Sequence, residues 1–229
     1  SVAWGRRPPQ TPAFLLTKPL RSPLSHTLLR SFLQIGGMRM KTKRRTVVTL
    51  DQLNRANQSV MRELMDLGLW THRLHHIQVW LVPRGESHGW QWYEGDRSIC
   101  IAAFSKARLR EARARKKRTT LRDVLRHEWA HAIASVHRAA FRSQAFREAF
   151  GGPHGWDFSW IYDSQHHVSN YAATATSEDF AETFMFFVKY RGRLPRRFDT
   201  PAIRRKWRFI ARLARRLRRY RRYYFRLNR

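Results

Sequence analysis

Cysteine is almost absent from this sequence, whose 229 residues include only Cys100. A single thiol excludes an intramolecular disulfide framework and any zinc finger or ribbon built on paired cysteines. Long apolar runs are also missing, and no stretch approaches the ~18 residues of a membrane-spanning helix. We therefore expect no transmembrane segment. The length and the 42% of hydrophobic residues suffice for one sizeable domain with a core.

Acidic residues are scarce, with 16 Asp and Glu against 46 Lys and Arg and a net charge of +30. Residues 1–50 hold ten basic residues and no acidic residue, and residues 189–229 hold eighteen basic residues and one acidic residue. The part between them, residues 51–188, has a net charge of only +3. One further basic block, residues 106–126, lies inside this middle part. The positive charge therefore belongs mainly to the two ends, and a polyanion is the expected partner.

The N-terminal segment, residues 1–45, is basic and rich in proline. This composition predicts a disordered arm without a packed core. It is also rich in Ser, Arg and Leu and poor in acids, which is typical of an organelle transit peptide. We expect a cytoplasmic protein that associates with nucleic acid, and organelle targeting by the arm is the open alternative.

The C-terminal segment, residues 191–229, is predicted to form an arginine-rich helix that begins with Pro201 at its first position. Arginines alternate with aromatic residues near its end, a pattern that favours non-specific nucleic-acid binding. Two alternatives stay open: the helix lies on an anionic membrane, or its apolar stripe docks on the body of the protein. That stripe comprises Ile203, Trp207, Ile210, Ala214 and Leu217.

The middle segment, residues 46–190, is predicted to form one α+β domain. Thr49 and Gln52 are spaced as a capping box at the start of a helix that Gly68 ends. A strand over residues 74–82 and a hairpin of residues 90–93 and 98–104 follow, in a small antiparallel or mixed sheet. The remaining helices are predicted over residues 121–136, 139–150 and 177–190.

The helix over residues 121–136 contains His127-Glu128-Trp129-Ala130-His131, a His-Glu-x-x-His motif. Two histidines four residues apart lie one turn apart on the same helix face, so both imidazoles can bind one Zn²⁺. Glu128 is then placed to polarise a water on the metal. The sequence therefore predicts a zinc site on a partly buried helix.

A third protein ligand is needed, and the sequence offers two candidates. His137 gives a spacing close to that of the metzincins, but Ala134 provides no reason for the helix to end. A continuing helix carries His137 about 240° away from His131, where it would act as a cation at the helix C-terminus.

The other candidate is Glu178, in the first turn of the helix over residues 177–190. Thr176 or Ser177 can cap this helix, and Glu182 lies on the same face as Glu178. Carboxylates on such an apolar helix need partners, and a metal and a histidine ligand would provide them.

The combination of His127 and His131 with Tyr171, Glu178 and Glu182 resembles the gluzincin metallopeptidases. More narrowly, it resembles the zinc-binding bacterial metallopeptidases related to the catalytic domain of anthrax lethal factor. The resemblance implies a zincin-like fold over residues 70–190, with the His-Glu-x-x-His helix as the active-site helix. It also implies Glu178 as the third zinc ligand, Glu182 as a support that orients a histidine ligand, and Tyr171 as a hydroxyl donor near the oxyanion.

The expected function is that of a zinc metalloendopeptidase acting on a protein or peptide substrate, with Glu128 as general base. The strand over residues 98–104 is the preferred candidate for the sheet edge that takes the substrate. The alternative is a nucleic-acid-binding or packaging protein with a structural or relict zinc site. The sequence predicts neither the cleavage specificity nor the oligomeric state.

Overall fold

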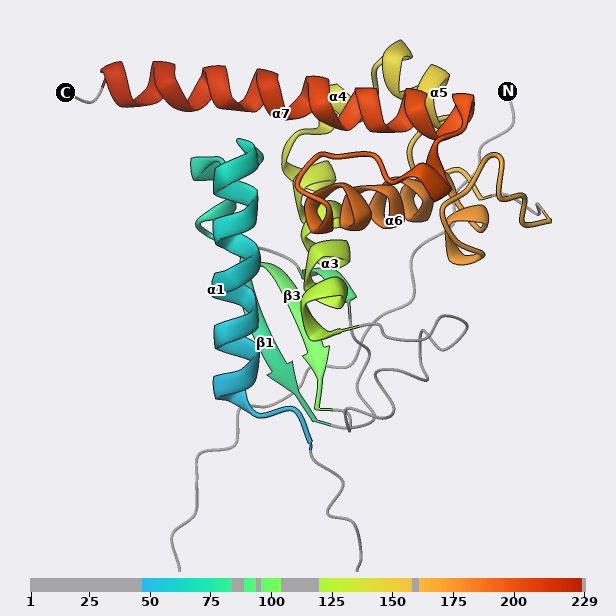
Figure 1. Ribbon diagram of the computed structural model, residues 1–229. Coiled ribbons are helices and arrows are strands. Elements are labelled where there is room, and N and C mark those ends of the chain that lie inside the picture. Colours follow the sequence, from blue (N-terminus) through green and yellow to red (C-terminus); the bar gives the residue numbers. More distant parts are fainter. Residues whose placement is uncertain (1–46, 84–88, 94–95, 104–119, 158–160, 228–229) are drawn as a thin grey trace, which may run out of the picture. The chain divides into compact units, whose positions relative to one another are not determined.

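The protein is described by a computed structural model that covers residues 47–83, 89–93, 96–103, 120–157 and 161–227 (Figure 1). Residues 43–229 group into one compact unit. The predicted disordered arm, residues 1–45, lies outside the described residues, as does most of the basic block over residues 106–126.

The first helix, α1 (Leu50–Leu67), has the predicted boundaries. Thr49 and Gln52 form the capping box, and Gly68 ends the helix in the left-handed conformation with φ 76°. The strand predicted over residues 74–82 is shorter than expected. A 3₁₀ turn, η1 (His72–Leu74), precedes β1 (Gln78–Val82). Leu74 is buried as part of this turn and not of the sheet.

The strands in the described part of the chain form a mixed sheet in the order β1-β3-β2. β3 (Asp96–Ala102) pairs antiparallel with β2 (Gly89–Tyr93), which confirms the predicted hairpin. β3 also pairs parallel with β1, so a purely antiparallel sheet is wrong. Because β3 inserts between the other two strands, the prediction that residues 98–104 form the substrate-binding edge is wrong as well.

α3 (Leu121–Val136) has the predicted boundaries and begins at a capping box of Thr120 and Asp123. The single helix predicted over residues 139–150 is in fact two, α4 (Arg138–Phe141) and α5 (Gln144–Phe150). The backbone of Ser143 is extended, and its hydroxyl accepts the N–H of Phe146, so α5 begins anew at this residue.

α6 (Thr176–Lys189) packs against α3 and is preceded by a short 3₁₀ turn, η2 (Tyr171–Ala173). The prediction that Thr176 or Ser177 caps α6 is wrong. Ala175 is the N-cap and makes no side-chain bond. The buried hydroxyl of Thr176 donates instead to the carbonyl of Pro153 and holds the preceding loop against the start of α6.

A 3₁₀ turn, η3 (Arg196–Phe198), leads to α7 (Pro201–Leu227), which runs alongside α6 (Figure 1). The apolar stripe that begins at Ile203 and ends at Leu217 is buried, and α7 contacts α5 and α6. The docking alternative for this stripe is therefore confirmed. Within the described ranges, no helix is long and apolar enough to cross a membrane. The fold class is α+β, as predicted.

Candidate metal centre

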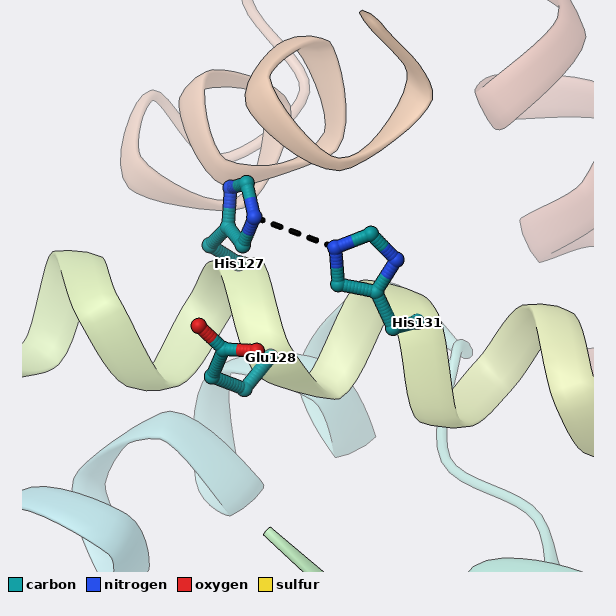
Figure 2. A group of neighbouring side chains, drawn as sticks. All are labelled: His127, Glu128 and His131. Atoms are coloured by element: carbon teal, nitrogen blue, oxygen red, sulfur yellow. Dashed lines mark hydrogen bonds between the residues drawn. The ribbon is translucent and has the colours of Figure 1, made fainter. Parts of the chain in front are cut away.

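His127 and His131 project from the side of α3 that faces α6 (Figure 2). Their Nε2 atoms lie 3.1 Å apart. His127 is 2% exposed, whereas the side chain of His131 is 15% exposed. The motif thus brings the two imidazoles together at the boundary between the core and the surface.

Glu178 reaches the same point from α6. One carboxylate oxygen lies 3.1 Å from Nε2 of His127, and the other lies 3.5 Å from Nε2 of His131. Oε2 is buried and has no hydrogen-bond partner in the described part of the chain. Two facing imidazole nitrogens and an unsatisfied carboxylate oxygen form a donor set of the kind that Zn²⁺ binds, so the residues fit this metal.

The charge state of Glu178 suits a ligand. Burial raises the pKa of this carboxyl group, but contacts with His127 and His131 outweigh that effect and hold the pKa well below its usual range. The carboxylate is therefore ionised at neutral pH, as metal binding requires.

Glu128 is 4% exposed and projects from a different side of α3 than the two imidazoles (Figure 2). The potential ligand atoms of His127, Glu128 and His131 all lie within 4.8 Å of one another. Two carboxylates thus lie near the histidine pair. Glu178 touches both Nε2 atoms directly, and this contact makes it the better candidate for the third ligand.

Glu182 supports His127 from the opposite side of the ring. Its Oε1 lies 2.9 Å from Nδ1 of His127, and Ser169 donates to its Oε2 at 2.8 Å. Sequence reasoning missed Ser169, which lies in an irregular stretch without a motif. One general rule could have predicted such a residue: both oxygens of a buried carboxylate need a hydrogen-bond donor.

Tyr171 lies at the start of η2, with its ring 5.7 Å from the ring of His127, and it is 49% exposed. Ser169 also accepts the N–H of Ala172 and so fixes this turn. The structure therefore gathers all six predicted site residues: His127, Glu128, His131, Tyr171, Glu178 and Glu182.

His137 lies apart from this group. It is the C-cap of α3, and its Nε2 is 3.1 Å from the hydroxyl of Thr71. Burial, and next the nearby Arg73, lower the pKa of His137 to about 4. The ring is neutral at pH 7, so a cationic role at the helix C-terminus is wrong.

Arg126, immediately before the motif, belongs to a buried ion-pair network that sequence reasoning missed. Its guanidinium group contacts both oxygens of Glu63 in α1, at 2.8 and 2.7 Å, and Asp123 in α3 at 2.6 Å. Lys189 of α6 reaches Asp123 at 2.9 Å. These contacts connect α1 and α6 to the motif helix, and Arg126, the last residue of the basic block over residues 106–126, is buried.

Comparison of the chain with protein-family models, curated proteins and solved structures finds no match. The gluzincin resemblance therefore rests on the residues of this chain alone.

Proposed function

We propose that this protein is a zinc-dependent metallopeptidase of gluzincin type with a zincin-like fold. The observation that carries the proposal is the convergence of His127, His131 and Glu178 from two separate helices, with contacts of 3.1–3.5 Å. The carboxylate of Glu182 behind His127 completes an arrangement that is typical of functional zinc sites.

The chemistry then divides among the neighbouring side chains. When bound, Zn²⁺ would lower the pKa of a water ligand toward ~7 and polarise the scissile carbonyl. Glu128 accepts the proton of the attacking water and passes it to the leaving amine. The hydroxyl of Tyr171 donates a hydrogen bond to the oxygen on which negative charge develops.

The edge strand β2 is the better candidate for binding an extended substrate. Among the described strands it pairs only with β3, and it contacts α3, the helix that carries the motif. A peptide added to this edge as a further strand would lie beside the active-site helix.

Metal analysis and peptide hydrolysis test the proposal together. Purified wild-type protein should contain about one zinc per chain, and His127→Ala should lose it. Glu128→Gln should retain the metal and lose roughly 10²–10⁴-fold in peptide hydrolysis. Absence of stoichiometric zinc from the wild type, or unchanged metal content in His127→Ala, would contradict the proposal.

A second candidate function, non-specific nucleic-acid binding, is favoured by α7. The apolar stripe of this helix is buried, so its arginines form an exposed face. The exposed arginines of α7 in the described residues include Arg204, Arg205, Arg208, Arg212, Arg215, Arg216 and Arg219. Nucleic-acid binding that is unchanged in Glu128→Gln would separate this role from peptide hydrolysis.

A further inference from the structure

A pocket of about 300 Å³ opens directly beside the candidate metal centre. His131 forms part of its wall, so one residue belongs both to the histidine pair and to the pocket. This volume lies at the lower end of the range of small-molecule sites, which suits one side chain or one chain end.

The lining of this pocket is strongly basic. Arg138, Arg142 and Arg147 all contribute to it, and none of its lining residues, all of them in the described part of the chain, is acidic. Arg142 and Arg147 are exposed, and neither forms an ion pair with an acidic side chain in the described ranges. Both arginines line the pocket without a carboxylate partner in the described ranges, so they are available to an anionic ligand.

The local fold explains why the arginines converge. α3 stops at His137, and the single turn α4 places Arg138 and Arg142 four residues apart on one face. α5 then starts at Gln144 and supplies Arg147. Because the helix predicted over residues 139–150 is broken here, the chain folds around the pocket.

The remaining walls are mostly apolar, and their polar groups are Ser135 and the ring of His154. Phe141 is buried and packs edge-on against Phe180 and at a tilted angle against Phe146, so this side of the pocket is backed by the aromatic core. His154 stacks edge-on against Phe141, and its Nε2 is buried without a hydrogen-bond partner in the described part of the chain. With the proton on Nε2, a ligand that accepts hydrogen bonds would satisfy both this nitrogen and the guanidinium groups.

We propose that this pocket is a substrate subsite that binds a carboxylate group of the peptide, either an Asp or Glu side chain or a free C-terminus. The inference rests on the proposed peptidase function, because His131 belongs to both the candidate metal centre and the pocket, and a carboxylate bound there would lie near the bond that is cleaved. Arginine suits this role because its planar group binds a carboxylate through two parallel hydrogen bonds.

A binding measurement tests the subsite independently of catalysis. The protein is the zinc-loaded Glu128→Gln variant, and the probes are fluorescent peptides with blocked ends that carry Glu or Gln at one scanned position. A neutral peptide with a free or an amidated C-terminus forms the second arm. In at least one arm, we expect the peptide that carries the carboxylate to bind roughly tenfold more tightly than its neutral counterpart. The arm that shows this preference tells whether the pocket binds an acidic side chain or a C-terminus.

Removing the pocket charge should abolish that preference. The double variant with Arg142→Gln and Arg147→Gln should bind the carboxylate peptide and its neutral counterpart equally. Both residues are exposed, so this variant should fold. Arg55→Gln, which removes an exposed arginine of α1, is the matched control and should keep the preference.

Three results would overturn the subsite. One is equal binding of carboxylate and neutral peptides, and another is an unchanged preference in the double variant. The third is tighter binding of a single-stranded oligonucleotide that the double variant loses, which would assign the pocket to phosphate. Hydrolysis of neutral peptides by the wild type alongside such a result would leave the peptidase proposal standing. Carboxylate-selective binding without any hydrolysis would contradict the peptidase proposal and would leave the pocket a carboxylate-binding site without a role in substrate cleavage.

Discussion

The Oε1 atom of Glu182 lies 2.9 Å from the Nδ1 atom of His127, across the interface between α6 and α3. A carboxylate at this distance accepts a hydrogen bond from Nδ1–H, and this tautomer leaves the lone pair of Nε2 directed at Glu178 and His131. Glu182 thus determines which nitrogen of His127 is available to a metal.

Removal of this carboxylate should weaken metal binding without removing a ligand. Glu182→Ala is expected to raise the zinc dissociation constant roughly 10–100-fold, and Ser169→Ala should have a smaller effect in the same direction. Competition with a chromophoric chelator measures both. Glu148→Gln, at an exposed position of α5, is the control. An unchanged dissociation constant in Glu182→Ala would mean that the contact does not support the metal.

The third ligand can be identified by comparing two substitutions. Glu178→Ala should lose most of its zinc, because the carboxylate is in contact with both imidazoles. The variant His137→Ala should keep its zinc, because the ring of His137 forms a hydrogen bond with Thr71 and lies apart from the histidine pair. Metal content by mass spectrometry distinguishes them. Zinc loss from His137→Ala alone would point to a metzincin-like ligand set.

Arg126 should be more important for stability than its place at the end of the basic block over residues 106–126 indicates. Arg126→Met leaves Glu63 and Asp123 without their buried partner, and we expect a loss of about 3–5 kcal/mol in the free energy of unfolding. Urea denaturation measures it. Arg122→Met is the matched control. Its half-exposed side chain reaches Glu63 only at 3.9 Å, and its loss should cost less than about 1 kcal/mol. Similar values for the two variants would contradict a special role for Arg126.

Acid should destabilise the fold through His137. Its pKa is about 4 in the folded protein and about 6.5 in the unfolded chain. The unfolded state therefore binds more protons between these values, and stability falls as the pH drops from 6.5 toward 4. His137→Gln should reduce this loss by roughly 1–2 kcal/mol between pH 7 and pH 4.5, allowing for partial exposure.

Denaturation curves over this pH range give the comparison. Burial lowers the pKa of His154 and His167 to about 4 as well, so His137→Gln should reduce the pH dependence without abolishing it. His76→Gln, at an exposed position, is the control. A wild-type pH dependence that His137→Gln leaves unchanged would refute the prediction.

Nucleic-acid binding by the arginine face of α7 should be sensitive to salt. A variant with Gln at Arg205, Arg208, Arg212 and Arg215 removes four exposed charges and leaves the buried stripe intact. We expect weaker binding to single-stranded DNA. The slope of the logarithm of the binding constant against the logarithm of the salt concentration should become less steep by roughly 0.7 for each phosphate that the variant no longer neutralises. Fluorescence anisotropy at several salt concentrations measures both. An identical slope in the variant would exclude this face as the binding surface.

The sequence predicted those features that depend on neighbouring residues. The capping box of Thr49, the boundaries of α3, the hairpin of β2 and β3 and the apolar stripe of α7 all follow from local spacing. The histidine pair belongs to the same group, because a four-residue separation on a helix fixes the relative position of the two side chains.

Only the tertiary structure decided which distant residues meet. It placed β3 in the centre of the sheet, divided the helix over residues 139–150 around a basic pocket, and bonded His137 to Thr71. It also brought Glu178 and Glu182 to the histidines and supplied Ser169 and Arg126 as partners of buried charges. Those contacts arise because buried polar groups need hydrogen-bond partners, and the packing of the helices determines which residues lie close enough to provide them. The periodicity of one segment carries no information about residues on another segment.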